Sequence, residues 1–142
     1  VLVGGYEAFV VNNFKVTADK ATDKIIGVLA IGPLLEGPKG VECVRWNVKD
    51  NKWETLWSRS DISSISMIPA VSTASDMVFV NGWYDNAGWK ITGLDWATGK
   101  TRHQVNLGKS NRGNGAYAIL QYFPNGDLLF NSVAGPFRAP LK

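Results

Sequence analysis

The feature that most constrains this chain is a succession of short runs rich in Val, Ile, Phe, Trp and Tyr, separated by clusters of Gly, Asn, Asp and Pro. Helical periodicity is nearly absent. Short β-branched and aromatic runs between turn-forming clusters are typical of strands, so the sequence predicts an all-β fold. The expected strands are 6–16, 24–31, 41–48, 53–59, 66–71, 77–83, 89–96, 101–107, 116–123 and 127–133. Hairpin-turn chemistry occurs at 49–52, 73–76, 97–100 and 124–127.

Parts of the sequence also repeat at a spacing of about fifty residues. Residues 46–57 align with 94–105 at an offset of 48, 75–81 with 126–132 at 51, and 22–28 with 75–81 at 53. A four-stranded unit of this length matches a β-propeller blade. A β-sandwich, the alternative all-β architecture, gives no reason for turn chemistry to recur at this spacing, so the repeat favours a propeller.

The strand count predicts a partial propeller of about two and a half blades, each of four antiparallel strands. We expect the first blade at 1–60, the second at 61–108 and the first half of a third at 109–142. A closed ring needs at least four blades, and open blades expose sheet edges. The remaining blades are therefore expected from the same chain, from another chain or from copies in a homo-oligomer. The abrupt start at Val1 favours a fragment.

The segment GLDWATGK (93–100) resembles the repeat of quinoprotein-like (PQQ-repeat-like) β-propellers, Ala-x-Asp-x-x-Thr-Gly-Lys-x-x-Trp. The matching residues are Asp95, Thr98, Gly99 and Lys100, while Gly93 replaces the Ala and His103 the final Trp. An earlier, poorer copy has Asn47, Asp50, Asn51 and Lys52 at the Asp, Thr, Gly and Lys positions. The resemblance implies blades between which a Trp docks, and we expect Trp46, Trp53 and Trp57 to pack between blades.

In a propeller, the loops that join the second to the third strand, and one blade to the next, open on the face where ligands usually bind. The corresponding loops here are 32–40, 60–65, 84–88, 108–115 and 134–140. The candidate ligand-binding residues on or beside them are Asp61, Trp83, Asp85, Asn86, Trp89, Asn111, Arg112, Asn114 and Arg138.

The chemistry of these residues suits a small molecule or a glycan. Aromatic rings cover the apolar face of a sugar, amides pair with its hydroxyl groups, and Arg binds anions through two parallel donors. The same residues can equally be turn or core residues, and both interpretations stay open at this point.

The sequence shows no catalytic or metal-binding constellation. The only histidine, His103, is expected on a surface or across a strand pair, and the only cysteine, Cys43, as a small buried residue. The net charge is only +3 and the basic residues are scattered, which argues against a nucleic-acid partner. No apolar stretch is long enough to predict a membrane span.

Three functions follow as hypotheses. The first is a non-catalytic binding or scaffold module. The second is part of a quinone-cofactor-dependent oxidoreductase acting on an alcohol or sugar, where the cofactor supplies the redox chemistry. The third is a self-assembling partial propeller. Whether the protein is an enzyme stays open and its cofactor is unknown. The resemblance implies an extracellular or periplasmic location.

Overall fold

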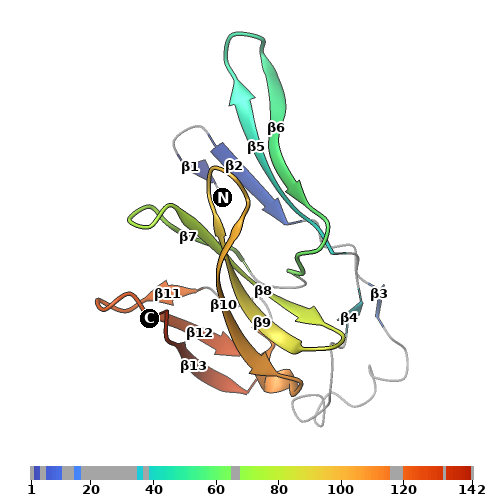
Figure 1. Cartoon of the computed structure of the whole chain (residues 1–142), viewed down its shortest axis with the longest axis vertical. Helices are drawn as coiled ribbons and strands as arrows, with labels where there is room; N and C mark the ends of the chain where they lie inside the picture. The colour runs from blue at the N-terminus through green and yellow to red at the C-terminus, as the bar shows by residue number, and fades with distance from the viewer. Residues whose placement is uncertain are drawn as a thin grey trace.

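The computed structural model describes residues 2–3, 6–10, 15–16, 35–36, 39–64, 68–115, 120–132 and 134–141. They form antiparallel sheets connected by turns, with one short 3-10 helix, η1 (Asn111–Gly113) (Figure 1). The predicted all-β class is confirmed.

Three sheets follow one another along the chain. The first sheet has the order β1 (Leu2–Val3), β2 (Tyr6–Val10), β5 (Val41–Asn47) and β6 (Lys52–Arg59). The second sheet has the order β7 (Ala70–Ser72), β8 (Met77–Tyr84), β9 (Gly88–Asp95) and β10 (Thr101–Gly108). The third has β11 (Gln121–Tyr122), β12 (Leu128–Ser132) and β13 (Gly135–Ala139), and a separate pair joins β3 (Lys15–Val16) to β4 (Leu35–Glu36).

Two features of this topology differ from the sequence expectation. β2 pairs directly with β5, with Ala8 opposite Cys43, although a further strand was expected between them. That expected strand, 24–31, lies outside the described residues. Residues 134–140 were expected to be an open loop, but 135–139 form β13, because Phe137 and Ala139 pack into the core opposite Phe130 and Leu128.

The second sheet is buried on both faces because its side chains alternate between two hydrophobic clusters. Phe79 and Ile91 belong to a cluster that includes Leu128 and Phe130 of the third sheet. Val80 and Leu94 belong to a second cluster that also contains Val41, Cys43 and Trp57 of the first sheet. Burial raises the pKa of the Cys43 thiol, which keeps it protonated and favours a packing role.

The contact between the first and second sheets centres on Trp57. Its indole Nε1 donates to the carbonyl oxygen of Trp96 at 2.9 Å, and its ring lies against Gly99. Arg59 adds a hydrogen bond to the carbonyl oxygen of Gly99 at 2.6 Å. Trp57 therefore packs between two sheets, which is the coarser part of the expectation that it docks between blades. The expectation was wrong for the other two: Trp46 and Trp53 pack edge-to-face on the projecting β5–β6 hairpin, 37% and 50% exposed.

The turns of the two aligned hairpins have the same local structure. Asn47 Oδ1 accepts from the backbone N–H of Asp50 at 3.0 Å, and Asp95 Oδ1 accepts from that of Thr98 at 3.0 Å. The left-handed residue follows in each turn, at Asn51 (φ 51°) and Gly99 (φ 69°). These equivalent positions are 48 residues apart, the offset at which the sequences align. Both hairpins therefore share one type of turn, in which an Asn or Asp side chain accepts from a backbone N–H and the next residue after that N–H has a positive φ.

Candidate functional site

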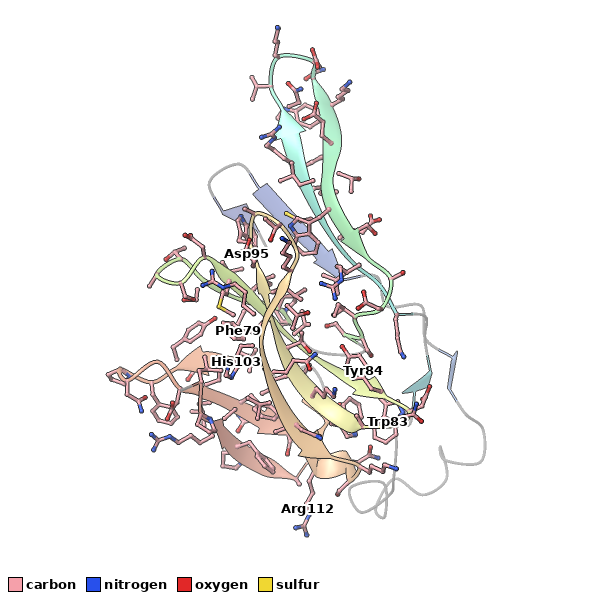
Figure 2. The ribbon with its side chains drawn as sticks, in the orientation of Figure 1. Phe79, Trp83, Tyr84, Asp95, His103 and Arg112 are labelled. Atoms are coloured by element: carbon pink, nitrogen blue, oxygen red, sulfur yellow. The ribbon has the colours of Figure 1, made fainter. Side chains whose placement is uncertain are left out.

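Two loops that the sequence singled out, 84–88 and 108–115, meet at one end of the second sheet. Trp83 Nε1 donates to Asp85 Oδ1 at 3.1 Å, and the rings of Trp83 and Trp89 lie edge-to-face, 5.7 Å apart. Trp89 Nε1 donates in turn to Asn111 Oδ1 at 3.3 Å. We call residues 83–89 and 109–114 the loop platform (Figure 2).

The inner members of the loop platform are buried and hold the loops in place. Trp89 and Asn111 are 0% and 1% exposed. Asn81, a residue that the sequence did not single out, donates to the carbonyl oxygen of Gly113 at 3.0 Å and accepts from the N–H of Gly115 at 2.8 Å. Gly113 leaves no room for a side chain, because a Cβ there would lie 2.6 Å from Trp89 Cβ.

The outer members of the loop platform are accessible to a ligand. Asp85, Asn86 and Arg112 are exposed, and Trp83 is half-buried. Asn114 is buried, and its backbone N–H donates to the carbonyl oxygen of Asn111. The accessible surface therefore combines an aromatic edge with an amide and with charges of both signs.

The structure gives the two remaining candidate residues other surroundings. Asp61 accepts two hydrogen bonds from Arg59, at 2.8 and 2.7 Å, beside the contact between the first and second sheets. Arg138 lies on β13 and forms an ion pair with Asp127 at 2.6 Å, close to the 123–127 turn. Its described partners, Asp127 and the Phe123 ring, belong to that turn and not to the loop platform.

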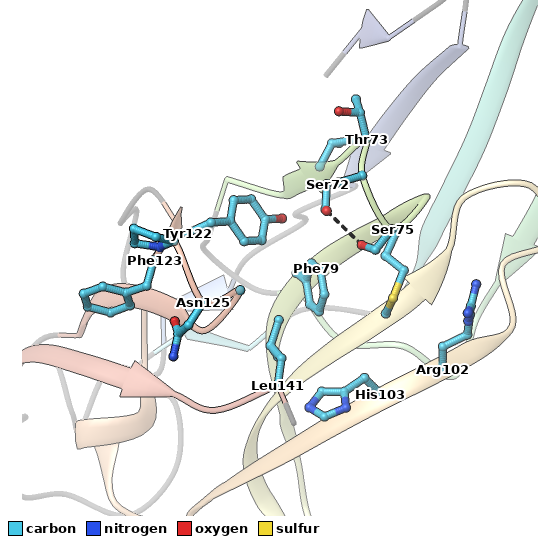
Figure 3. Close-up of a pocket in the computed structure, with 15 residues that line it drawn as sticks. Ser72, Thr73, Ser75, Phe79, Arg102, His103, Tyr122, Phe123, Asn125 and Leu141 are labelled. Carbon is cyan, nitrogen blue, oxygen red and sulfur yellow. Dashed lines mark hydrogen bonds between the residues drawn. The ribbon is translucent and has the colours of Figure 1, made fainter.

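A groove that the sequence did not reveal lies between the second and third sheets. Its volume is about 700 Å³, and its described lining comes from 71–75, from Met77 and Phe79 of β8, from Arg102 and His103 of β10, from 122–126 and from Leu141. Figure 3 shows His103, Tyr122 and Phe79 around it. The 73–76 and 123–126 turns are about fifty residues apart in sequence, and each is an ordinary hairpin. The sequence offered one clue that these two turns lie side by side: they recur at the repeat spacing of about fifty residues.

Hydrogen-bonded carboxylates at the turns lead to a pH prediction. The Thr98 hydroxyl and Arg102 hold the pKa of Asp95 below its usual range, and Asn125 and Arg138 do the same for Asp127. The unfolded chain, whose carboxyl groups have higher pKa values, then binds protons more readily than the folded one. We expect the free energy of unfolding to be constant near neutral pH and to fall below about pH 4.

Urea denaturation between pH 7 and pH 3 measures this dependence. Asp127→Asn should weaken the decline at low pH, because one of the responsible groups no longer titrates. A urea midpoint that is unchanged down to pH 3 would contradict the assignment.

The described residues contain no cluster of three or more His, Cys, Asp or Glu side chains placed to hold a metal ion. Within the same part of the chain, no helix is long and apolar enough to cross a membrane. No protein-family model, curated protein or solved structure matches this chain.

Proposed function

We propose that the chain is a non-catalytic binding module built from propeller-type blades, and that its loop platform binds a neutral polyhydroxylated ligand such as a sugar. The observation that carries the proposal is the chain of contacts from Asp85 through Trp83 and Trp89 to Asn111. It joins two loops, 84–88 and 108–115, into one surface on a rigid base.

The arrangement of the sheets supports the blade assignment. The second sheet is built from four consecutive strands in chain order, as a blade is, and the first sheet also keeps the chain order although β3 and β4 pair separately between β2 and β5. The second sheet packs on a neighbour through each face. Trp57 docks on the turn at Gly99, which resembles the inter-blade Trp contact of quinoprotein-like propellers.

The charge pattern of the loop platform favours a neutral ligand. Asp85 and Arg112 give exposed charges of opposite sign, and Asn86 adds an amide that can donate and accept. An anionic ligand would be repelled by Asp85 and a cationic ligand by Arg112. A sugar ring instead presents an apolar face to Trp83 and hydroxyl groups to the polar side chains.

Titration of the ¹⁵N-labelled full chain with glucose, galactose, mannose and their disaccharides tests this function. At millimolar concentrations, we expect at least one sugar to shift the Trp83 indole N–H signal and the amides of 85–87 in a saturable way. Asp85→Ala should weaken that binding about tenfold, because hydrogen bonds to a charged group contribute about 1.5–3 kcal/mol.

Trp46→Ala is the matched control, since it removes an exposed Trp from the β5–β6 hairpin and should leave sugar binding unchanged. If none of these sugars shifts the loop-platform signals, or if Asp85→Ala binds as tightly as the wild-type chain, the proposed ligand class is wrong.

A further inference from the structure

The groove between the second and third sheets has the size of a small-molecule site. Its volume of about 700 Å³ lies within the range of about 300–1,000 Å³ usual for ligand pockets. The groove lies between the 73–76 and 123–127 turns, next to the hydrophobic core that joins the second and third sheets. Phe79 is buried in that core and contacts Tyr122 edge-to-face, with 6.1 Å between ring centroids.

The inner surface of the groove is apolar and partly aromatic. Met77 and Phe79 contribute to the floor, and Tyr122 and Leu141 line the sides. Gly93, on the strand behind, makes room for this floor, because a Cβ there would lie 2.7 Å from Phe79 Cε1. Tyr122 is 38% exposed, and its partial burial raises the pKa of its phenol to about 12, so the phenol stays neutral and can donate a hydrogen bond. Such an apolar, aromatic lining suits a ligand that carries an aromatic ring.

The charged side chain in the described lining of the groove is the cation Arg102. Arg102 and His103 come from β10, and the described lining residues include no Asp or Glu. Three carboxylates lie near the groove but outside its described lining: Asp95 pairs with Arg102 Nη1 at 3.2 Å, Asp127 pairs with Arg138, and Asp76 is exposed on the 73–76 turn. An anionic group in the groove would therefore meet no lining carboxylate.

His103 forms the wall of the groove beside Arg102. Its Nε2 is enclosed by the protein and has no hydrogen-bond partner among the described residues, so the ring borders the groove without turning this nitrogen toward it. Arg102, its neighbour in sequence, has a side chain that is 54% exposed and can turn donors toward the groove. A carboxylate placed at this wall would pair with the guanidinium group of Arg102 and lie beside the His103 ring.

We propose that this groove binds a small aromatic carboxylate, with its ring between Tyr122 and the Met77–Phe79 floor and its carboxylate paired with Arg102, beside the His103 ring. This site is separate from the loop platform and shares no residue with it. The hydroxyl groups of Ser72 and Thr73 and the amide of Asn125, at the rim, add donors for ring substituents. Binding of an aromatic carboxylate in the groove can therefore be tested independently of sugar binding at the loop platform.

The single histidine of the chain gives a direct test. The imidazole Cε1–H signal of the full-length chain belongs to His103 alone and can be followed by NMR during titration with phenylacetate. We expect a saturable shift of this signal together with the Tyr122 ring signals. Phenylacetamide, which has the same shape without the charge, should bind about tenfold more weakly, because charged hydrogen bonds are the stronger ones.

Two variants and a control locate the site. Arg102→Gln should weaken phenylacetate binding about tenfold. Ala74→Trp, on the exposed 73–76 turn, should block the groove and abolish the shift. Arg45→Gln is the matched control, because Arg45 also pairs with a carboxylate at 3.2 Å, on the distant β5–β6 hairpin. The proposal is overturned if the His103 signal shows no saturable shift, if the acid and amide bind equally, or if Arg102→Gln has no effect.

Discussion

We expect Trp57→Ala to lower the free energy of unfolding by about 3–5 kcal/mol, the range for removing a large buried aromatic side chain. Trp57 is 8% exposed and belongs to the cluster between the first and second sheets. Its removal leaves a cavity beside Gly99 and takes away the donor to the Trp96 carbonyl oxygen. Urea denaturation monitored by far-UV circular dichroism measures the loss.

Two further variants show which part of the Trp57 contact carries this effect. Trp57→Phe keeps an aromatic ring but loses the indole N–H, and should cost about 1–2 kcal/mol. Trp53→Ala removes an indole that is 50% exposed and should cost about 1 kcal/mol, the order of an aromatic pair contact. If Trp57→Ala cost no more than Trp53→Ala, Trp57 would not be the centre of the inter-sheet contact.

Much of the local structure follows from the sequence because hairpins are specified by neighbouring residues. The Asp95–Thr98–Gly99 turn needs only a short side chain that caps the backbone and a residue with positive φ. The offset of 48 residues then identifies its counterpart at Asn47, Asp50 and Asn51. Both strands flanking each of these turns were predicted within one residue of their observed bounds.

Pairing between distant strands is less accessible to sequence reasoning. β2 pairs with β5 across about thirty intervening residues. The residues of neither strand, nor the turns beside them, predict that partner. Residues 134–140 were predicted to be a loop because Gly135 and Pro136 are typical turn residues. β13 is, however, the edge strand of the described third sheet, and Pro is tolerated in an edge strand.

In the candidate site, too, residue types could be interpreted from the sequence, whereas contacts between distant residues could not. Asn111 and Trp89 looked like ligand-binding residues because their types suit recognition, but they bond to each other across two loops. Composition does not reveal such a partner. The groove depends on how far two separate hairpin turns diverge, which is set by the packing of whole sheets rather than by either turn.

We expect Gly99→Ala to lower the free energy of unfolding by about 2–4 kcal/mol, from two causes that can be separated. The residue has φ 69°, which costs an L-residue about 1 kcal/mol. The new Cβ would also lie 2.6 Å from Cδ2 of the Trp57 ring, and such overpacking costs about 1–3 kcal/mol. Gly126→Ala is the control, because Gly126 has φ 90° but open space around its Cβ position. It should show the backbone cost alone.

The double variant Trp57→Ala/Gly99→Ala then tests whether the Trp57 ring and the Gly99 turn act as one contact. Once the indole is gone, the methyl group at 99 has room, so it should cost no more than the methyl group in Gly126→Ala. The double variant should therefore be more stable than the sum of the single losses predicts, by about 1–3 kcal/mol, within the range of coupling between touching residues. Additive losses in urea denaturation would mean that Trp57 does not press on this turn. The contact on which the blade assignment depends would then be absent.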